Sequence, residues 1–80
     1  MTEIYETLRT ILMAAIGRLR LAVHALVKAQ AADDTQKKII YMRECREHIY
    51  QAVMDLMNGA KRIFQVLHEW GHDWTPVPEL

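Results

Sequence analysis

The chain has 80 residues, of which 51% are hydrophobic and 25% are charged, and ten basic residues balance ten acidic ones. This composition is typical of one small folded domain and excludes a disordered, polar chain. The lack of net positive charge argues against a dedicated nucleic-acid-binding protein. Cys45 is the single cysteine, so no disulfide can form within the chain, and its place among apolar residues predicts a small buried side chain.

The first predicted element is a helix over residues 3–31. Thr2 is a suitable N-cap, and Glu3 and Glu6 lie in the first turn, where the helix dipole favours negative charge. Apolar residues recur at steps of three and four, the spacing of one helical face, at Ile4, Leu8, Ile11, Leu12, Ala15, Ile16, Leu19, Val23, Leu26 and Val27. Because the start lacks a basic signal-peptide region and the uncharged runs are short, we expect a cytoplasmic protein without membrane association.

A second helix is predicted over residues 34–70. Asp33 is the predicted N-cap, with Gln36 as its capping-box partner. The apolar stripe of this helix comprises Ile39, Met42, Cys45, Ile49, Val53, Leu56, Ala60, Ile63, Leu67 and Trp70. Asn58-Gly59 is a common turn sequence, but the stripe keeps its phase across it. One continuous helix is therefore favoured over a bend at Gly59.

The short connection between the two helices predicts an antiparallel hairpin. The fold class is thus all-α, with the hairpin in residues 1–70 and a short C-terminal tail in residues 71–80. Folding about residues 32–33 places Leu26 opposite Ile39, and the large residues of the two apolar stripes are expected to fill the contact between the helices.

The second helix is longer, and in this pairing it extends beyond the first from about residue 62. The apolar surface is also wider than one helix–helix contact can cover, so we expect it to bind another protein chain or a second copy in a homodimer or tetramer, such as a four-helix bundle. Burial against a folded-back tail is the alternative. The residues predicted to bind the partner are Phe64, Leu67, Trp70 and Trp74, with Met54 and Met57 beside them.

His68-Glu69-Trp70-Gly71-His72 matches the H-E-x-x-H pattern of zinc proteases. On a helix, His68 and His72 would share one face and could hold Zn²⁺, with Glu69 as the general base. A third protein ligand and a walled substrate cleft are needed for catalysis, and a helical hairpin does not supply the cleft. We therefore expect no enzyme and no cofactor, with zinc binding at His68 and His72 as the alternative.

The chain starts with a helix near residue 3, turns at Ala32-Asp33-Asp34 and returns as a longer amphipathic helix. In length, turn position and hydrophobic spacing, the stretch from Arg18 to Ile63 resembles the small co-chaperones of type III secretion needle subunits. The resemblance implies a cytoplasmic hairpin that pairs with a helical-repeat chaperone and keeps the needle subunit from polymerising early. A second likeness is to the plasmid-encoded dimeric hairpin that stabilises RNA–RNA kissing complexes.

The sequence therefore predicts a non-enzymatic protein–protein interaction module that acts as a co-chaperone, an adaptor or an inhibitor. Its binding surface would be the apolar helix faces and the aromatic C-terminal segment. The alternatives are a zinc-binding protein and a homodimeric helical-hairpin regulator of phage or plasmid origin. No nucleic-acid partner is expected.

Overall fold

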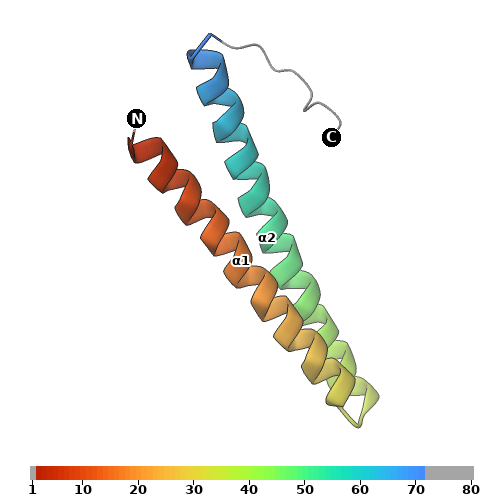
Figure 1. Cartoon of the computed structure of the whole chain (residues 1–80). Coiled ribbons are helices and arrows are strands. Elements are labelled where there is room, and N and C mark those ends of the chain that lie inside the picture. The colour runs from red at the N-terminus through yellow and green to blue at the C-terminus, as the bar shows by residue number, and fades with distance from the viewer. Residues whose placement is uncertain (1, 72–80) are drawn as a thin grey trace, which may run out of the picture.

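The computed structural model describes residues 2–71, which form two antiparallel helices joined by a short turn (Figure 1). Helix α1 spans Thr2–Ala31 and helix α2 spans Thr35–Glu69, each within one residue of the predicted bounds. The prediction of an all-α hairpin is confirmed. Helix α2 is also continuous through Gly59, as the unbroken phase of its apolar stripe predicted.

Asp34, and not the predicted Asp33, is the N-cap of α2. Its carboxylate oxygen Oδ1 accepts hydrogen bonds from the backbone N–H groups of Gln36 at 2.7 Å and Lys37 at 3.2 Å. The cap has extended backbone angles, which end the turn and start the helix at Thr35. Gln36 is therefore the second helical residue, one position too early to complete a capping box.

Lys38 closes the other side of the turn. Its Nζ donates a hydrogen bond to the backbone carbonyl of Ala29 at 3.1 Å, in the last turn of α1. The carbonyls of a last helical turn lack partners within the helix and carry partial negative charge, so an ammonium group there satisfies a hydrogen bond and the helix dipole together.

We expect Asp34→Ala to lower the free energy of unfolding by about 1 kcal/mol, because two N–H groups of the first turn lose their acceptor. Asp33→Ala is the matched control, since it removes the same charge from the neighbouring position. Urea denaturation followed by circular dichroism distinguishes them. Equal losses in the two variants would show that Asp34 has no special role.

The contact between the helices, which we call the seam, is built from small residues. Among residues 3–71, the buried ones are Ala15, Ala22, Ala25, Ala29, Cys45, Ala52 and Gly59. Three of them in each helix recur every seventh residue, the repeat that keeps one line of side chains facing a partner helix. The predicted burial of Cys45 is confirmed, and small side chains allow the two backbones to approach closely.

The prediction that the large apolar residues fill the seam is wrong. Leu26 lies beside Met42, not Ile39, and both remain about half exposed. The register therefore differs from the predicted one by about three residues, close to one helical turn. The cause is that the alanines occupy the seam in place of the large residues, which are their neighbours in the sequence.

The same register brings Ile11 to Gly59. Its methyl carbon Cγ2 lies 3.4 Å from the point that a Cβ on Gly59 would occupy, which is an ordinary van der Waals distance, so Ile11 packs against Gly59. Helix α2 runs on past the start of α1 (Figure 1).

Candidate interaction surface

The two faces of the hairpin beside the seam differ sharply in chemistry. On one face, Leu26 of α1 and Met42 of α2 line the same shallow groove. Leu12 and Leu19 lie fourteen and seven residues before Leu26 on α1 and form a line with it. On α2, the residues that follow Met42 at steps of seven form a second line. Residues seven apart lie on the same side of a helix, so both lines stay on this face. This side of the molecule is therefore apolar along most of its length.

We define the apolar face as the eleven exposed large aliphatic and methionine residues on these lines and on the lines beside them. Their exposed fractions are 41–61%, although each belongs to a helix whose seam residues are buried. The set is Leu12, Ile16, Leu19, Val23, Leu26, Ile39, Met42, Ile49, Val53, Leu56 and Ile63. A two-helix layer gives these side chains no second layer to pack against.

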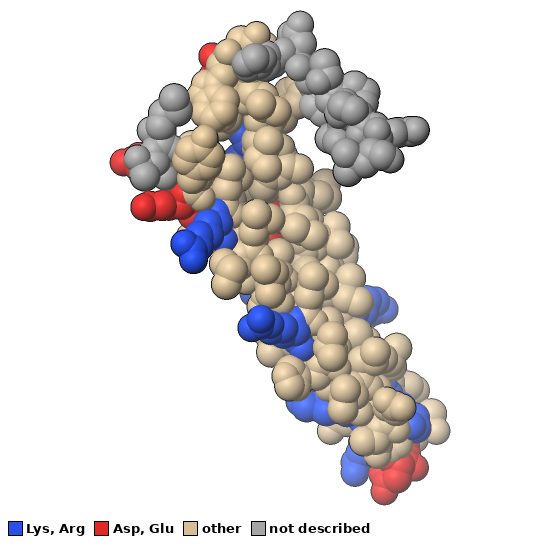
Figure 2. Space-filling view, in the orientation of Figure 1, with Lys and Arg blue, Asp and Glu red and all other residues tan. Residues whose placement is uncertain are grey.

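Charges on the apolar face are few. Arg9 lies seven residues before Ile16 on α1, and Arg46 lies seven residues before Val53 on α2, so each interrupts its apolar line once. Lys38 also lines the groove beside Leu26 and Met42. Figure 2 shows a broad uncharged surface along the hairpin, with isolated Lys and Arg side chains and most of the visible Asp and Glu near the two ends. Contiguous exposed apolar surfaces are typical of the sites at which proteins bind partners.

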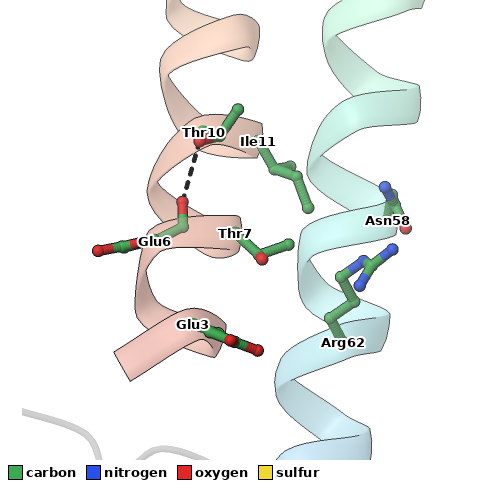
Figure 3. Close-up of a pocket in the computed structure, with 7 residues that line it drawn as sticks. All are labelled: Glu3, Glu6, Thr7, Thr10, Ile11, Asn58 and Arg62. Carbon is green, nitrogen blue, oxygen red and sulfur yellow. Dashed lines mark hydrogen bonds between the residues drawn. The ribbon is translucent and has the colours of Figure 1, made fainter. Parts of the chain in front are cut away.

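The opposite face is polar. The Lys28 ammonium lies 5.8 Å from the centre of the Tyr41 ring, a cation–π contact across the helices. Toward the other end, where the helices diverge in Figure 1, a groove of ≈ 530 Å³ opens between them. Its lining residues are Glu3, Glu6, Thr7, Thr10, Ile11, Asn58 and Arg62 (Figure 3).

This polar groove is open and its side chains are mostly exposed. The Thr10 hydroxyl donates to the backbone carbonyl of Glu6 at 3.0 Å, a bond within the helix that uses its one proton. Glu3 and Glu6 lie on α1, and Arg62 extends from α2 on the other side (Figure 3). The arrangement is that of a solvated helix face and lacks the enclosure in which carboxylates acquire catalytic reactivity.

The predicted partner-binding residues fall on several sides of α2. Trp70 is exposed and lies seven residues after Ile63, so it extends the line of the apolar face. Leu67 is half-buried and lies fourteen residues after Val53, on the next line of that face. Phe64, Met54 and Met57 are exposed on lines beyond the edge of the apolar face, and Trp74 lies outside the described residues.

The H-E-x-x-H motif spans the end of α2. His68 is exposed, Glu69 is the last helical residue, and Gly71 has a left-handed backbone with φ 77°. The Gly71 N–H donates to the His68 carbonyl at 3.1 Å, the bonding of a glycine that terminates a helix. Helical geometry therefore ends before the motif does, and His72 lies outside the described residues. Within residues 2–71, no three His, Cys, Asp or Glu side chains are grouped to hold a metal ion.

Length and composition alone would allow α1 to cross a membrane. The helix has a mean hydropathy of 1.6 over an 18-residue window, and only 17% of that window is buried. Arg18 and Arg20 lie near its middle, where each charge would cost about 2.5–3.5 kcal/mol in a bilayer. A helix that packs against another protein has the same apolar content, so the expectation of no membrane association stays a prediction.

Comparison of the chain with protein-family models, with curated proteins and with solved structures found no match. The candidate site therefore rests on the geometry of the hairpin. Sequence reasoning identified the residues of the apolar face as apolar helix positions but assigned them to the seam. The signal that would have separated the two is the seven-residue spacing of small residues, as in Ala15, Ala22 and Ala29.

Proposed function

We propose that the protein is a non-enzymatic binding module that docks the apolar face of its hairpin onto another polypeptide, as a co-chaperone, an adaptor or an inhibitor. The proposal rests on one observation: the small residues form the seam, and the eleven large residues of the apolar face remain 41–61% exposed. Covering them would contribute on the order of 1 kcal/mol each, because about half of each side chain still contacts water.

The co-chaperones of type III secretion needle subunits remain the particular form of this function that the sequence resemblance implies. A cytoplasmic hairpin with one apolar and one polar face is what such a role needs, since the apolar face can pack on a helical-repeat chaperone while the polar face stays in water. The exposed Phe64 and Trp70 would add aromatic contacts at the end of that surface.

The proposal is tested by combining the solution mass of the full chain, from light scattering, with titration of a dye that fluoresces on apolar surfaces. We expect a helical chain that either associates or, as a monomer, binds the dye, because the apolar face must contact protein or remain open. A helical monomer that does not bind the dye would contradict the proposal, since the chain itself would then cover the face.

The zinc-binding alternative makes the opposite prediction for metal. We expect equimolar Zn²⁺ to leave the midpoint of thermal unfolding unchanged, because the helix ends at Glu69 and Gly71, with φ 77°, departs from helical geometry within the motif. Stoichiometric zinc that is retained on dialysis and lost in His68→Ala would contradict this result and establish the metal site.

A further inference from the structure

We propose that the partner that covers the apolar face is an amphipathic helix of another protein, with Asp or Glu along the borders of its apolar stripe. This inference rests on the proposed binding function and names the chemistry of the partner. It follows from the positive charge of the grooves on the apolar face and from the lack of carboxylates near the arginines that line them.

Three shallow grooves on the apolar face combine large apolar residues with cations. The first is lined by Leu19 and its neighbours on α1, and its arginine is Arg20. The second lies between Leu26 and Met42, and its cation is Lys38. The third adjoins the second and is also lined by Lys38. No Asp or Glu within residues 2–71 lines any of these three grooves.

The third groove gathers the most positive charge. Lys38, Arg43 and Arg46 line it together with Ile39 and Met42, and its volume is ≈ 420 Å³. Guanidinium groups bind carboxylates through paired hydrogen bonds, and apolar side chains beside them can bury the rest of a ligand residue. The groove therefore suits a ligand that presents a carboxylate next to an apolar side chain.

Most carboxylates of the two helices lie on the polar face. Glu3 and Glu6 line the polar groove. Glu44, Asp55 and Glu69 lie at multiples of seven residues from other residues that line it, so they share its side of the hairpin. The positive charge of the apolar face is therefore not balanced by these acidic residues.

Two arginines of these grooves have no acidic neighbour along their helix. The residues three and four positions from Arg20 and from Arg46 include no Asp or Glu, whereas Arg43 has Glu47 four positions on. Helix α1 has no Asp or Glu over residues 7–32, so it offers none to Arg46 across the seam. A partner that covers the face must therefore supply carboxylates, or it leaves buried guanidinium groups unpaired.

A second copy of the chain does not supply them. With the two turns at the same end, Arg46 of one copy lies at the level of Arg46 of the other. With the turns at opposite ends, the register set by the contact between Ile11 and Gly59 brings Arg9 of one copy to the level of Arg46 of the other. Both arrangements place like charges in one apolar layer, which is unfavourable.

A protein helix fits these charges better than an anionic membrane does. Arg46 lies between Ile39 and Val53 on one apolar line, so a bilayer that received this line would also receive the guanidinium group. A helix packed along the two-helix layer can place a carboxylate at that level. The chain also has no net charge, so it has no overall attraction to an anionic surface.

The test uses two fluorescent peptides of about 20 residues, a length that allows a stable helix. Both peptides carry one stripe of leucines, which is bordered by Glu in the first and by Lys in the second. Fluorescence anisotropy measures the affinity of the full-length chain for each. We expect the Glu peptide to bind at least about tenfold more tightly, because its carboxylates meet the cations of the face.

Arg46→Gln is expected to weaken binding of the Glu peptide by about fivefold, the effect of one lost charge pair. Arg62→Gln is the matched control, because Arg62 is an exposed arginine of the same helix that lines the polar groove. It removes the same net charge and should leave the affinity unchanged. Circular dichroism of each variant establishes that it is folded.

A preference for the Glu peptide that falls in Arg46→Gln but not in Arg62→Gln supports the acidic helix as partner. Equal binding of the two peptides, or binding of the dye but of neither peptide, overturns the acidic partner and leaves the proposed binding function intact. Flotation with vesicles of phosphatidylcholine and phosphatidylserine, without a preference between peptides, overturns it in favour of a membrane. A helical monomer that binds neither peptide nor the dye overturns both proposals.

Discussion

Replacing Ala52 by leucine is expected to lower the free energy of unfolding by about 2–3 kcal/mol, the upper part of the range for overpacked interiors. Ala52 is 1% exposed, the lowest value among the described residues of the seam, and the seam is lined by alanine, cysteine and glycine. A leucine there cannot find space unless the helices separate. Separation would also open the contacts of Cys45 and Gly59, which lie seven residues to either side.

The matched control is Ala14→Leu, which adds the same side chain to an exposed position of α1. Its effect should stay within about 0.5 kcal/mol, as is usual for surface substitutions. Urea denaturation followed by circular dichroism compares the two variants. If Ala52→Leu is as stable as the unaltered chain, the helices do not meet through small residues, and a seam of large side chains would be favoured again.

Leu19→Glu is expected to weaken association of the chain with its partner by at least about thirtyfold, which corresponds to the loss of roughly 2 kcal/mol at a central contact. Leu19 lies near the middle of the apolar face, and a buried carboxylate without a partner is costly. Helicity should not fall, because glutamate is a good helix former and the position does not belong to the seam.

Leu21→Glu is a close control for this experiment. Leu21 is the same residue type on the same helix, 47% exposed against 44% for Leu19, but it lies seven residues from Lys28 and belongs to the polar face. Its association should be unchanged. The comparison is made by sedimentation equilibrium over a range of concentrations, and equal weakening in both variants would refute the assignment of binding to one face.

The sequence was sufficient to predict the fold because its signals are local. Periodic apolar residues predict the two helices, and the unbroken phase of the apolar stripe across Asn58-Gly59 predicts that the second helix is continuous. The predicted N-cap was one residue too early because Asp33 and Asp34 are equally good capping residues. Which of them accepts the hydrogen bonds depends on the path of the turn, and composition does not encode that path.

The seam could not be predicted from the apolar stripe alone. A stripe of apolar residues shows which side of a helix avoids water, but the stripes here are wide enough to hold two contacts. The large residues were assigned to the contact within the chain, whereas the alanines at positions 15, 22 and 29 occupy it. Small residues repeated every seven positions indicate close helix–helix approach, and the large residues beside them then remain for a partner.

The methionines offer the most direct test of the central claim, because they report on the native chain without substitution. Met42 belongs to the apolar face and is 48% exposed, while Met54 is 51% exposed on another side of the same helix. Partial oxidation with peroxide, read by peptide mass spectrometry, measures the rate at each sulfur. We expect Met42 to be oxidised several-fold more slowly than Met54 when the partner is bound, and at a similar rate after dilution dissociates it. Equal rates in the associated state, or protection of Met54 in place of Met42, would contradict the claim that the apolar face is the binding surface.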